Sequence, residues 1–176
     1  MRMNDHGSGG NLQSVLFVCT GNIFRSVTAE YALKAHLGPD TSHVISSAGI
    51  DAKPQSMHAW VQARLREKGA DLTTHIPRQL TRELVEGADL VICDTMYSLA
   101  ETSSTKEDWG HSSNVVAIDL CHQARAKRLA LFHHDPFHDD EDIERMHEDS
   151  IRYEELTRDG PPLEVLCAYD GLEVPL

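Results

Sequence analysis

The sequence has little positive charge and no long apolar run. Its 16 Lys and Arg residues stand against 28 Asp and Glu, which gives a formal net charge of -12 over 176 residues. This balance disfavours a nucleic-acid or anionic-membrane partner, because either one requires a basic patch. No apolar run is long enough for a transmembrane helix, and the N-terminus lacks a signal-peptide core. We therefore expect a globular cytoplasmic protein with a flexible polar leader over residues 1–13.

Paired cysteines are also absent, as is the lysine of a Walker-type phosphate loop. No two cysteines form a C-x-x-C pair, so a disulfide framework is excluded and reduced thiols in the cytoplasm are expected. A G-x4-G-K-[ST] motif does not occur, which excludes a nucleotide-binding loop of that type. The four cysteines are Cys19, Cys93, Cys121 and Cys167.

Short apolar runs alternate with helical patterns along the chain. This alternation predicts a three-layer α/β domain, in which helices cover a parallel sheet of four strands in the flavodoxin-like order 2-1-3-4. The domain is expected over residues 14–158, followed by a C-terminal tail, 159–176, of unknown role. The predicted strands are 14–19, 43–47, 88–93 and 114–118, and the predicted helices are 26–37, one near 57–65, a short one after Thr81, one after Asp94 or Thr95, and 140–157.

The most informative stretch is C-T-G-N-I-F-R-S, residues 19–26, between the first strand and the first helix. Backbone N–H groups in such a turn can converge on one point, and the helix adds its positive end. Gly21 permits a tight turn, Asn22 tolerates a left-handed conformation, and Arg25 presents a planar fork to two phosphate oxygens. The same dipoles favour a thiolate at Cys19, to which Ser26 could donate a hydrogen bond. We interpret the loop as a cup for a tetrahedral oxyanion above a nucleophilic cysteine.

The alternative is that Cys19 is a buried hydrophobe and Arg25 a surface charge. That alternative leaves the C-x5-R-S spacing at a strand end unexplained. The stretch V-L-F-V-C-T-G-N-I-F-R-S-V-T-A-E resembles the signature of low-molecular-weight protein tyrosine phosphatases. Further similar segments follow in the expected order, and the resemblance spans about residues 14–157. These segments are S-S-A-G (46–49), H-I-P-R-Q-L-T (75–81), A-D-L-V-I-C (88–93) and D-P-F (135–137).

The resemblance implies hydrolysis of phosphomonoesters through a cysteinyl-phosphate intermediate, with no metal and no cofactor. It implies that Cys19 is the nucleophile, that Arg25 clamps the phosphate, and that Asp135 is the general acid and base. The phosphate-binding loop then comprises Thr20, Gly21, Asn22, Ile23, Phe24, Arg25 and Ser26, and the residues that support it are Asn22, Ser26, Ser47 and His75.

The loop around Asp135 allows two interpretations. Pro136 fixes the backbone after Asp135 and helps to present a carboxyl that can give and take a proton. Asp119 is the alternative acid. A metal site is the other interpretation of this loop, but a solvated acidic loop explains the density of possible ligands better, because no metal-binding motif is present. The possible ligands in this region are His133, His134, Asp135, His138, Asp139, Asp140, Asp142 and His147.

Several positions bear on the substrate and on redox protection. The resemblance implies a pocket wall of Thr20, Ile23, Lys53 and Phe137. Ile23 is the residue usual in tyrosine-specific members, whereas related arginine phosphatases have Thr there. Many members carry a second cysteine where this chain has Phe24, and a proline where it has Val27. We therefore expect a phosphotyrosine substrate and a nucleophile without its usual neighbouring thiol.

The expected partners are a phosphotyrosine-containing protein or peptide and inorganic phosphate as product. Three other functions stay open from the sequence. They are a protein-arginine phosphatase on the same scaffold, a thiol-linked arsenate reductase, and a non-enzymatic phosphate-binding module. The arsenate reductase needs two further cysteines close together, and Cys93 and Cys121 are far apart in the sequence.

Overall fold

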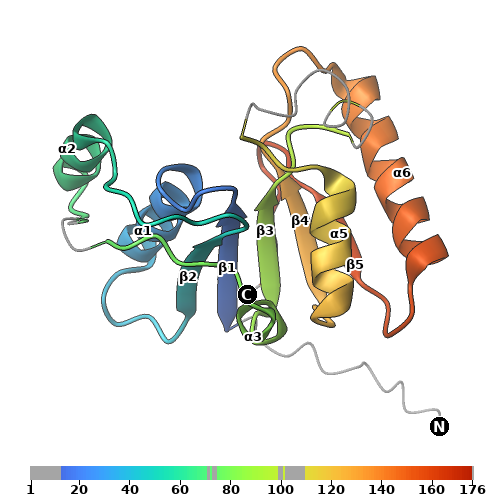
Figure 1. The fold of residues 1–176 in the computed structure, drawn as a ribbon, viewed down its shortest axis with the longest axis horizontal. Helices are drawn as coiled ribbons and strands as arrows, with labels where there is room; N and C mark the ends of the chain where they lie inside the picture. Colours follow the sequence, from blue (N-terminus) through green and yellow to red (C-terminus); the bar gives the residue numbers. More distant parts are fainter. Residues whose placement is uncertain (1–12, 71, 73–74, 99–100, 102–109, 176) are drawn as a thin grey trace, which may run out of the picture.

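Five parallel strands form the centre of the molecule (Figure 1). A computed structural model describes residues 13–70, 72, 75–98, 101 and 110–175. The sheet order is β2-β1-β3-β4-β5, so the predicted order 2-1-3-4 is confirmed and a fifth strand extends it. The strands are β1 (Ser14–Cys19), β2 (Val44–Gly49), β3 (Leu90–Asp94), β4 (Arg128–Phe132) and β5 (Glu164–Cys167).

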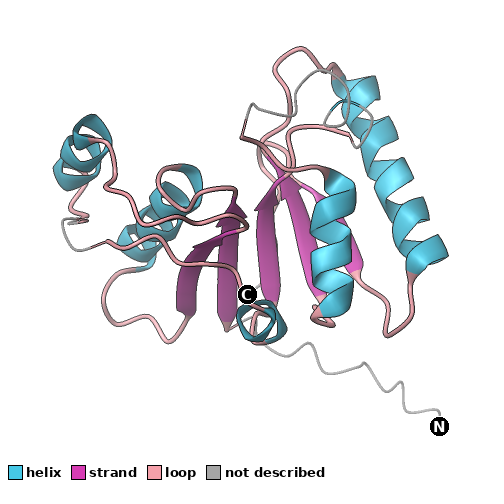
Figure 2. Cartoon of the chain, viewed as in Figure 1, coloured by secondary structure: helices cyan, strands magenta, loops and turns pink. Residues whose placement is uncertain are grey.

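Helices cover both faces of this sheet, which confirms the three-layer prediction (Figure 2). Helix α1 packs against β1 and β2, while α5 contacts both α3 and α6 on the opposite face. In β1, Leu16 faces the α5 side and Phe17 faces the α1 side, because side chains alternate along a strand. The helices are α1 (Arg25–Leu37), α2 (Ala59–Glu67), α3 (Arg82–Glu86), α5 (Asn114–Gln123) and α6 (Asp140–Thr157).

One predicted strand is wrong. Residues 114–118 open helix α5, and the fourth strand is Arg128–Phe132 instead. The Ser113 hydroxyl accepts a hydrogen bond from Val116 N at 3.3 Å, which is a helix N-cap. The predicted helix after Asp94 falls largely outside the described residues, and Asp94 itself is the last residue of β3.

The segment predicted as a tail of unknown role contributes β5. Val165 lies opposite Leu129 in the parallel ladder and is buried in the core on the α5 side. The carboxylate of Glu154, near the end of α6, accepts a hydrogen bond from Leu163 N at 2.9 Å and so fixes the turn into the strand. Val174 packs on the other face of the sheet with Val15. This segment is therefore part of the sheet and its core. Among the residues that the structure places, no helix is long and apolar enough to cross a membrane.

Replacing Val165 with Asp tests the position of β5. We expect Val165→Asp to lower the free energy of unfolding by about 2–4 kcal/mol, because an unpaired carboxylate would be buried in the core. Urea unfolding followed by circular dichroism measures the change. The control Glu164→Gln changes an exposed side chain paired with Arg128, and we expect a loss within about 1 kcal/mol. Equal, small effects for both variants would contradict the placement of β5.

Candidate active site

Cys19 ends β1 at the carboxyl edge of the sheet, and helix α1 begins six residues later at Arg25. The Cys19 side chain is buried, and its Sγ lies 3.1 Å from the hydroxyl oxygen of Ser26 in the first turn of α1. A sulfur held beside a hydroxyl group at the start of a helix is placed to act as a nucleophile on a bound anion. The structure therefore brings together the cysteine and the serine that the sequence pattern selected.

The side chain of Asn22 holds the loop from within. Asn22 is fully buried and has a φ of 51°, in the left-handed region that asparagine tolerates. Its amide nitrogen donates to the hydroxyls of Ser26 at 3.0 Å and Ser47 at 2.8 Å, and its amide oxygen accepts from Arg78 N at 2.8 Å. His75 Nε2 donates to the Asn22 carbonyl at 2.9 Å. The start of α1 and two segments distant in the sequence, β2 and residues 75–78, are thus tied to this one residue.

Glu30 extends this network and was not selected from the sequence. Its carboxylate accepts a hydrogen bond from the Ser47 hydroxyl and pairs with Lys34. Glu30 lies one turn after Ser26, on the buried face of α1. The sequence feature that could have identified Glu30 is a single acidic residue on the inner face of the helix that follows the loop. The Ser47 hydroxyl thus donates to Glu30 and accepts from Asn22.

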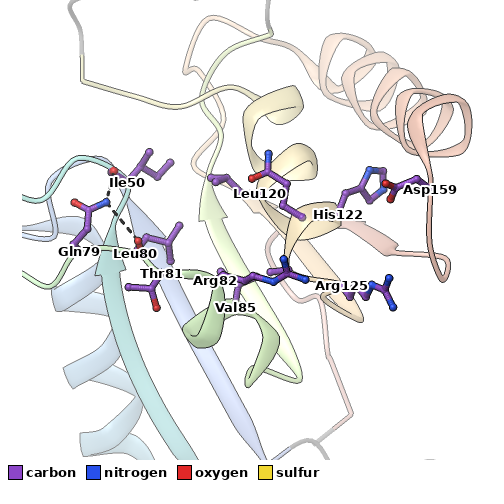
Figure 3. Close-up of a pocket in the computed structure, with 12 residues that line it drawn as sticks. Ile50, Gln79, Leu80, Thr81, Arg82, Val85, Leu120, His122, Arg125 and Asp159 are labelled. Atoms are coloured by element: carbon purple, nitrogen blue, oxygen red, sulfur yellow. Dashed lines mark hydrogen bonds between the residues drawn. The ribbon is translucent and has the colours of Figure 1, made fainter.

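The backbone after β2 supports the loop from the other side. Ile50 N donates to the Cys19 carbonyl at 3.0 Å, and Asp51 N donates to the Thr20 carbonyl at 2.8 Å. Gln79 braces this segment, because its amide donates to the Ile50 carbonyl at 2.7 Å (Figure 3). At Gly49 a Cβ atom would lie 2.8–2.9 Å from three backbone atoms of residues 20–22, so only glycine fits there.

Arg25 is held by protein groups beside the cup. Its Nη1 pairs with the buried carboxylate of Asp94 and contacts His111 Nδ1, and its Nη2 donates to the Gly110 carbonyl at 2.7 Å. The same carbonyl accepts from the Thr20 hydroxyl at 2.6 Å. Asp94, one of the two residues predicted to precede a helix, is the acidic partner of Arg25. An acid at the carboxyl end of the strand next to β1 was the signal for this role.

Two imidazoles complete the surroundings of Asp94. His111 Nδ1 lies 3.2 Å from both carboxylate oxygens, and His133 Nδ1 lies 3.1 Å from one of them. Burial lowers the pKa of His111, and the neighbouring Asp94 opposes that shift. His133 follows β4 directly, so Asp94 connects Arg25 to the loop that carries Asp135.

Asp135 lies on that loop, at the same edge of the sheet as Cys19. Its side chain is buried, and one carboxylate oxygen accepts a hydrogen bond from Phe137 N at 3.0 Å. One oxygen also lies within 4.8 Å of ligand atoms of Glu101 and His138. The alternative acid, Asp119, lies inside α5 and accepts from the Tyr153 hydroxyl at 2.9 Å. Asp135 is therefore the better placed of the two candidate acids.

The predicted pocket wall is only partly gathered at the loop. Thr20 is bound to the Gly110 carbonyl, and Ile23 is half-buried within the loop itself. Lys53 pairs with Asp51 on the surface, and the ring of Phe137 is 93% exposed. The roles of Lys53 and Phe137 in a substrate pocket stay predictions.

A cavity of about 500 Å³ lies between α3 and α5 (Figure 3). Val85 and Leu120 form part of its apolar lining, and Arg82 and His122 are among its polar residues. None of its lining residues belongs to the loop of residues 19–26. This cavity therefore does not contain the cysteine, and the candidate chemistry lies at the edge of the sheet.

The family model for low-molecular-weight phosphotyrosine protein phosphatases matches residues 14–155. The chain belongs to that family. This chain is 38% identical over 81 residues to the low-molecular-weight protein-tyrosine-phosphatase Ptp of Acinetobacter johnsonii, and the match covers 46% of this chain and 55% of the relative. It is 42% identical over 85 residues to the protein-arginine-phosphatase of Bacillus subtilis, and this match also covers 46% of this chain and 55% of the relative.

An arsenate reductase of Bacillus licheniformis is also similar to this phosphatase-family chain. The two sequences are 38% identical over 80 residues, which again cover 46% of this chain and 55% of the relative. The chain thus spans about half the length of the curated relatives it matches. Because relatives named for three activities share the matched region, membership of the family does not select one substrate.

Replacing Gly49 with Ala tests the support of the loop. We expect Gly49→Ala to weaken binding of inorganic phosphate about tenfold or more, because the new methyl group displaces the backbone of residues 20–22. Isothermal titration calorimetry measures the affinity, and circular dichroism confirms that the variant is folded. At Gly160 a Cβ atom would meet nothing within 4 Å, so Gly160→Ala is the control and should bind like the unchanged chain. Unchanged binding by Gly49→Ala would refute the close approach.

Proposed function

We infer that this protein hydrolyses phosphomonoesters, with phosphotyrosine in proteins or peptides as its substrate. The observation that carries the proposal is the buried Cys19 sulfur, 3.1 Å from the Ser26 hydroxyl, at the start of α1. A thiolate at that point lies where converging N–H groups and the helix dipole can hold a phosphate. Family membership over residues 14–155 supports the same chemistry.

The proposed reaction has two steps at phosphorus. The Cys19 thiolate attacks the phosphorus atom, an S–P bond forms, and the P–O bond to the leaving group breaks while Asp135 gives its proton to the leaving oxygen. A water molecule then attacks the phosphorus, the S–P bond breaks, and the Asp135 carboxylate takes the proton of that water. Inorganic phosphate leaves, and the thiolate is restored without any cofactor.

Arg25 has a specific task in the proposed reaction. Its two terminal nitrogens now contact Asp94, His111 and the Gly110 carbonyl. Phosphate oxygens would replace the Gly110 carbonyl as acceptors for Arg25 and Thr20, while Asp94 keeps the guanidinium oriented. A charge-assisted contact of this kind stabilises charge that develops on the transferring phosphoryl group.

The positions of the other cysteines bear on the alternative of an arsenate reductase. Cys93 lies opposite Val18 in the ladder, and both side chains are on the same face of the sheet. Because successive side chains of a strand alternate between the two faces, Cys93 is on the opposite face from Cys19. Burial raises the pKa of Cys93 well above its usual range and that of Cys121 to about 12. Buried thiols with raised pKa values react slowly, which disfavours a relay of oxidation through them. The free thiols also support a reducing compartment such as the cytoplasm.

Replacing the nucleophile tests the reaction. We expect Cys19→Ser to lower hydrolysis of an aryl phosphate more than about 10³-fold while phosphate binding survives, because only the attacking atom is lost. Stopped-time assays and calorimetry measure the two quantities, and Cys167→Ser is the control that should keep its rate. Turnover at the original rate in Cys19→Ser would exclude the mechanism.

A separate assay of the unchanged chain with phosphotyrosine peptides, with phosphoarginine peptides, and with arsenate and thioredoxin then identifies the substrate.

Replacing the acid tests the role of Asp135. We expect Asp135→Asn to slow hydrolysis about 100-fold or more for alkyl and phenyl esters, whose leaving groups need a proton. The loss should be much smaller for nitrophenyl esters, whose leaving groups depart as anions. Rates across a leaving-group series give this dependence, with Asp140→Asn, an exposed acid of the same region, as the control. An equal loss for every ester would show that Asp135 is not the acid.

A further inference from the structure

Asp94, His111 and His133 place three metal-ligating atoms together at the edge of the cup. Their carboxylate oxygen and ring nitrogens all lie within 4.8 Å of one another. The oxygen-to-nitrogen separations are 3.2 Å to His111 and 3.1 Å to His133. Three separate segments supply these side chains: the end of β3, the residues just before α5, and the residue after β4.

These separations match those of ligands around one zinc ion. With metal–ligand bonds of about 2.1 Å, two ligands of a tetrahedral site lie about 3.4 Å apart. Two imidazoles and one carboxylate are a typical zinc donor set, and the fourth position takes water or another ligand. The His133 side chain is 38% exposed, which leaves the site open to solvent, whereas that of Asp94 is 4% exposed.

Arg25 occupies the same donors. Its Nη1 pairs with Oδ2 of Asp94, the carboxylate whose Oδ1 lies near both imidazoles, and it contacts His111 Nδ1, which a metal ion would also need. A guanidinium and a divalent cation cannot share these atoms at bonding distance, because both are positive and the space between the atoms holds only one of them. Binding of a metal ion must therefore release Arg25 from Asp94.

We propose that Asp94, His111 and His133 form a site for a zinc-type divalent cation, which competes with Arg25 for the Asp94 carboxylate. An occupied site deprives Arg25 of its orienting partner and places a second positive charge beside it. Under the proposed function, metal binding therefore inhibits the phosphatase reversibly. The proposal has two parts. Metal binding at this site does not depend on the proposed function, whereas inhibition by the bound metal rests on it.

The second candidate ligand set is less suited to zinc. It combines the carboxylates of Glu101 and Asp135 with one imidazole, that of His138. Two carboxylates with a single imidazole favour harder cations such as Mg²⁺ or Mn²⁺ over Zn²⁺. A fourth imidazole, that of His134, lies 3.5 Å from the sulfur of Cys167 and belongs to neither set. Variants of His138 and His134 thus distinguish the proposed site from its neighbours.

The binding test uses the full chain with Cys19→Ser, so that the nucleophile cannot ligate the probe. Zn²⁺ is titrated by calorimetry, and Co²⁺ by the visible d–d absorption of a site with nitrogen and oxygen donors. We expect one equivalent to bind, and His111→Ala or His133→Ala to weaken binding about tenfold or more. Arg25→Met should tighten binding about tenfold, because the competing cation is removed. The controls His134→Ala and His138→Ala should bind like the parent.

Each outcome decides a part of the proposal. Loss of binding in His138→Ala or His134→Ala, with retention in His133→Ala, would overturn the site. Unchanged affinity in Arg25→Met would overturn the competition.

In the chain with Cys19, Zn²⁺ should inhibit aryl phosphate hydrolysis over the concentration range in which it binds, and a chelator should restore the rate. His133→Ala should shift that inhibition about tenfold, measured against its own metal-free rate. Inhibition that does not shift would assign it to another site, whereas absence of hydrolysis would affect only the proposed function.

Discussion

The buried amide of Asn22 is the interaction on which the candidate site depends. It uses both hydrogens and its oxygen to join the loop to α1, to β2 and to the backbone at Arg78. A fully buried amide must find such partners, because an unpaired polar group in the core costs about 1–3 kcal/mol. The left-handed backbone of Asn22 and the serines around it are therefore determined together. The position of the Cys19 sulfur follows from this arrangement, since Ser26 belongs to the same network.

The predicted loop of residues 19–26 lies between β1 and α1, whereas one of the four predicted strands is wrong. Residues 19–26 combine a strand end, turn-forming residues and a helix start, and each of these has a local physical cause. The apolar run at 114–118 does not by itself determine a secondary structure, because a short apolar run is equally compatible with a buried strand and a buried helix. The serine at 113 was the distinguishing signal, since a hydroxyl just before an apolar run can cap a helix.

Other features depend on tertiary structure and could not be predicted from local pattern. The strand at 164–167 is four residues long and gains its stability from pairing with β4 and from the turn that Glu154 fixes. The pairing of Arg25 with Asp94 joins residues 69 positions apart, and only the order of the strands brings them together. Glu30 acquires its role in the same way, because Ser47 reaches it from β2. Such contacts follow from the fold and from no motif.

Charge around the cup shows how an anion can bind to a protein with a net charge of -12. Asp94 partly neutralises Arg25, so the guanidinium alone does not supply the positive potential. The backbone N–H groups at the start of α1 must supply the rest, and the first turn of α1 has no acidic residue to compensate them. Helix α6 is the opposite case, since Asp140, Glu141 and Asp142 fill its first turn and Asp139 caps it. The positive end of α1 thus stays available to a thiolate and a phosphate, whereas that of α6 is compensated by its own acids.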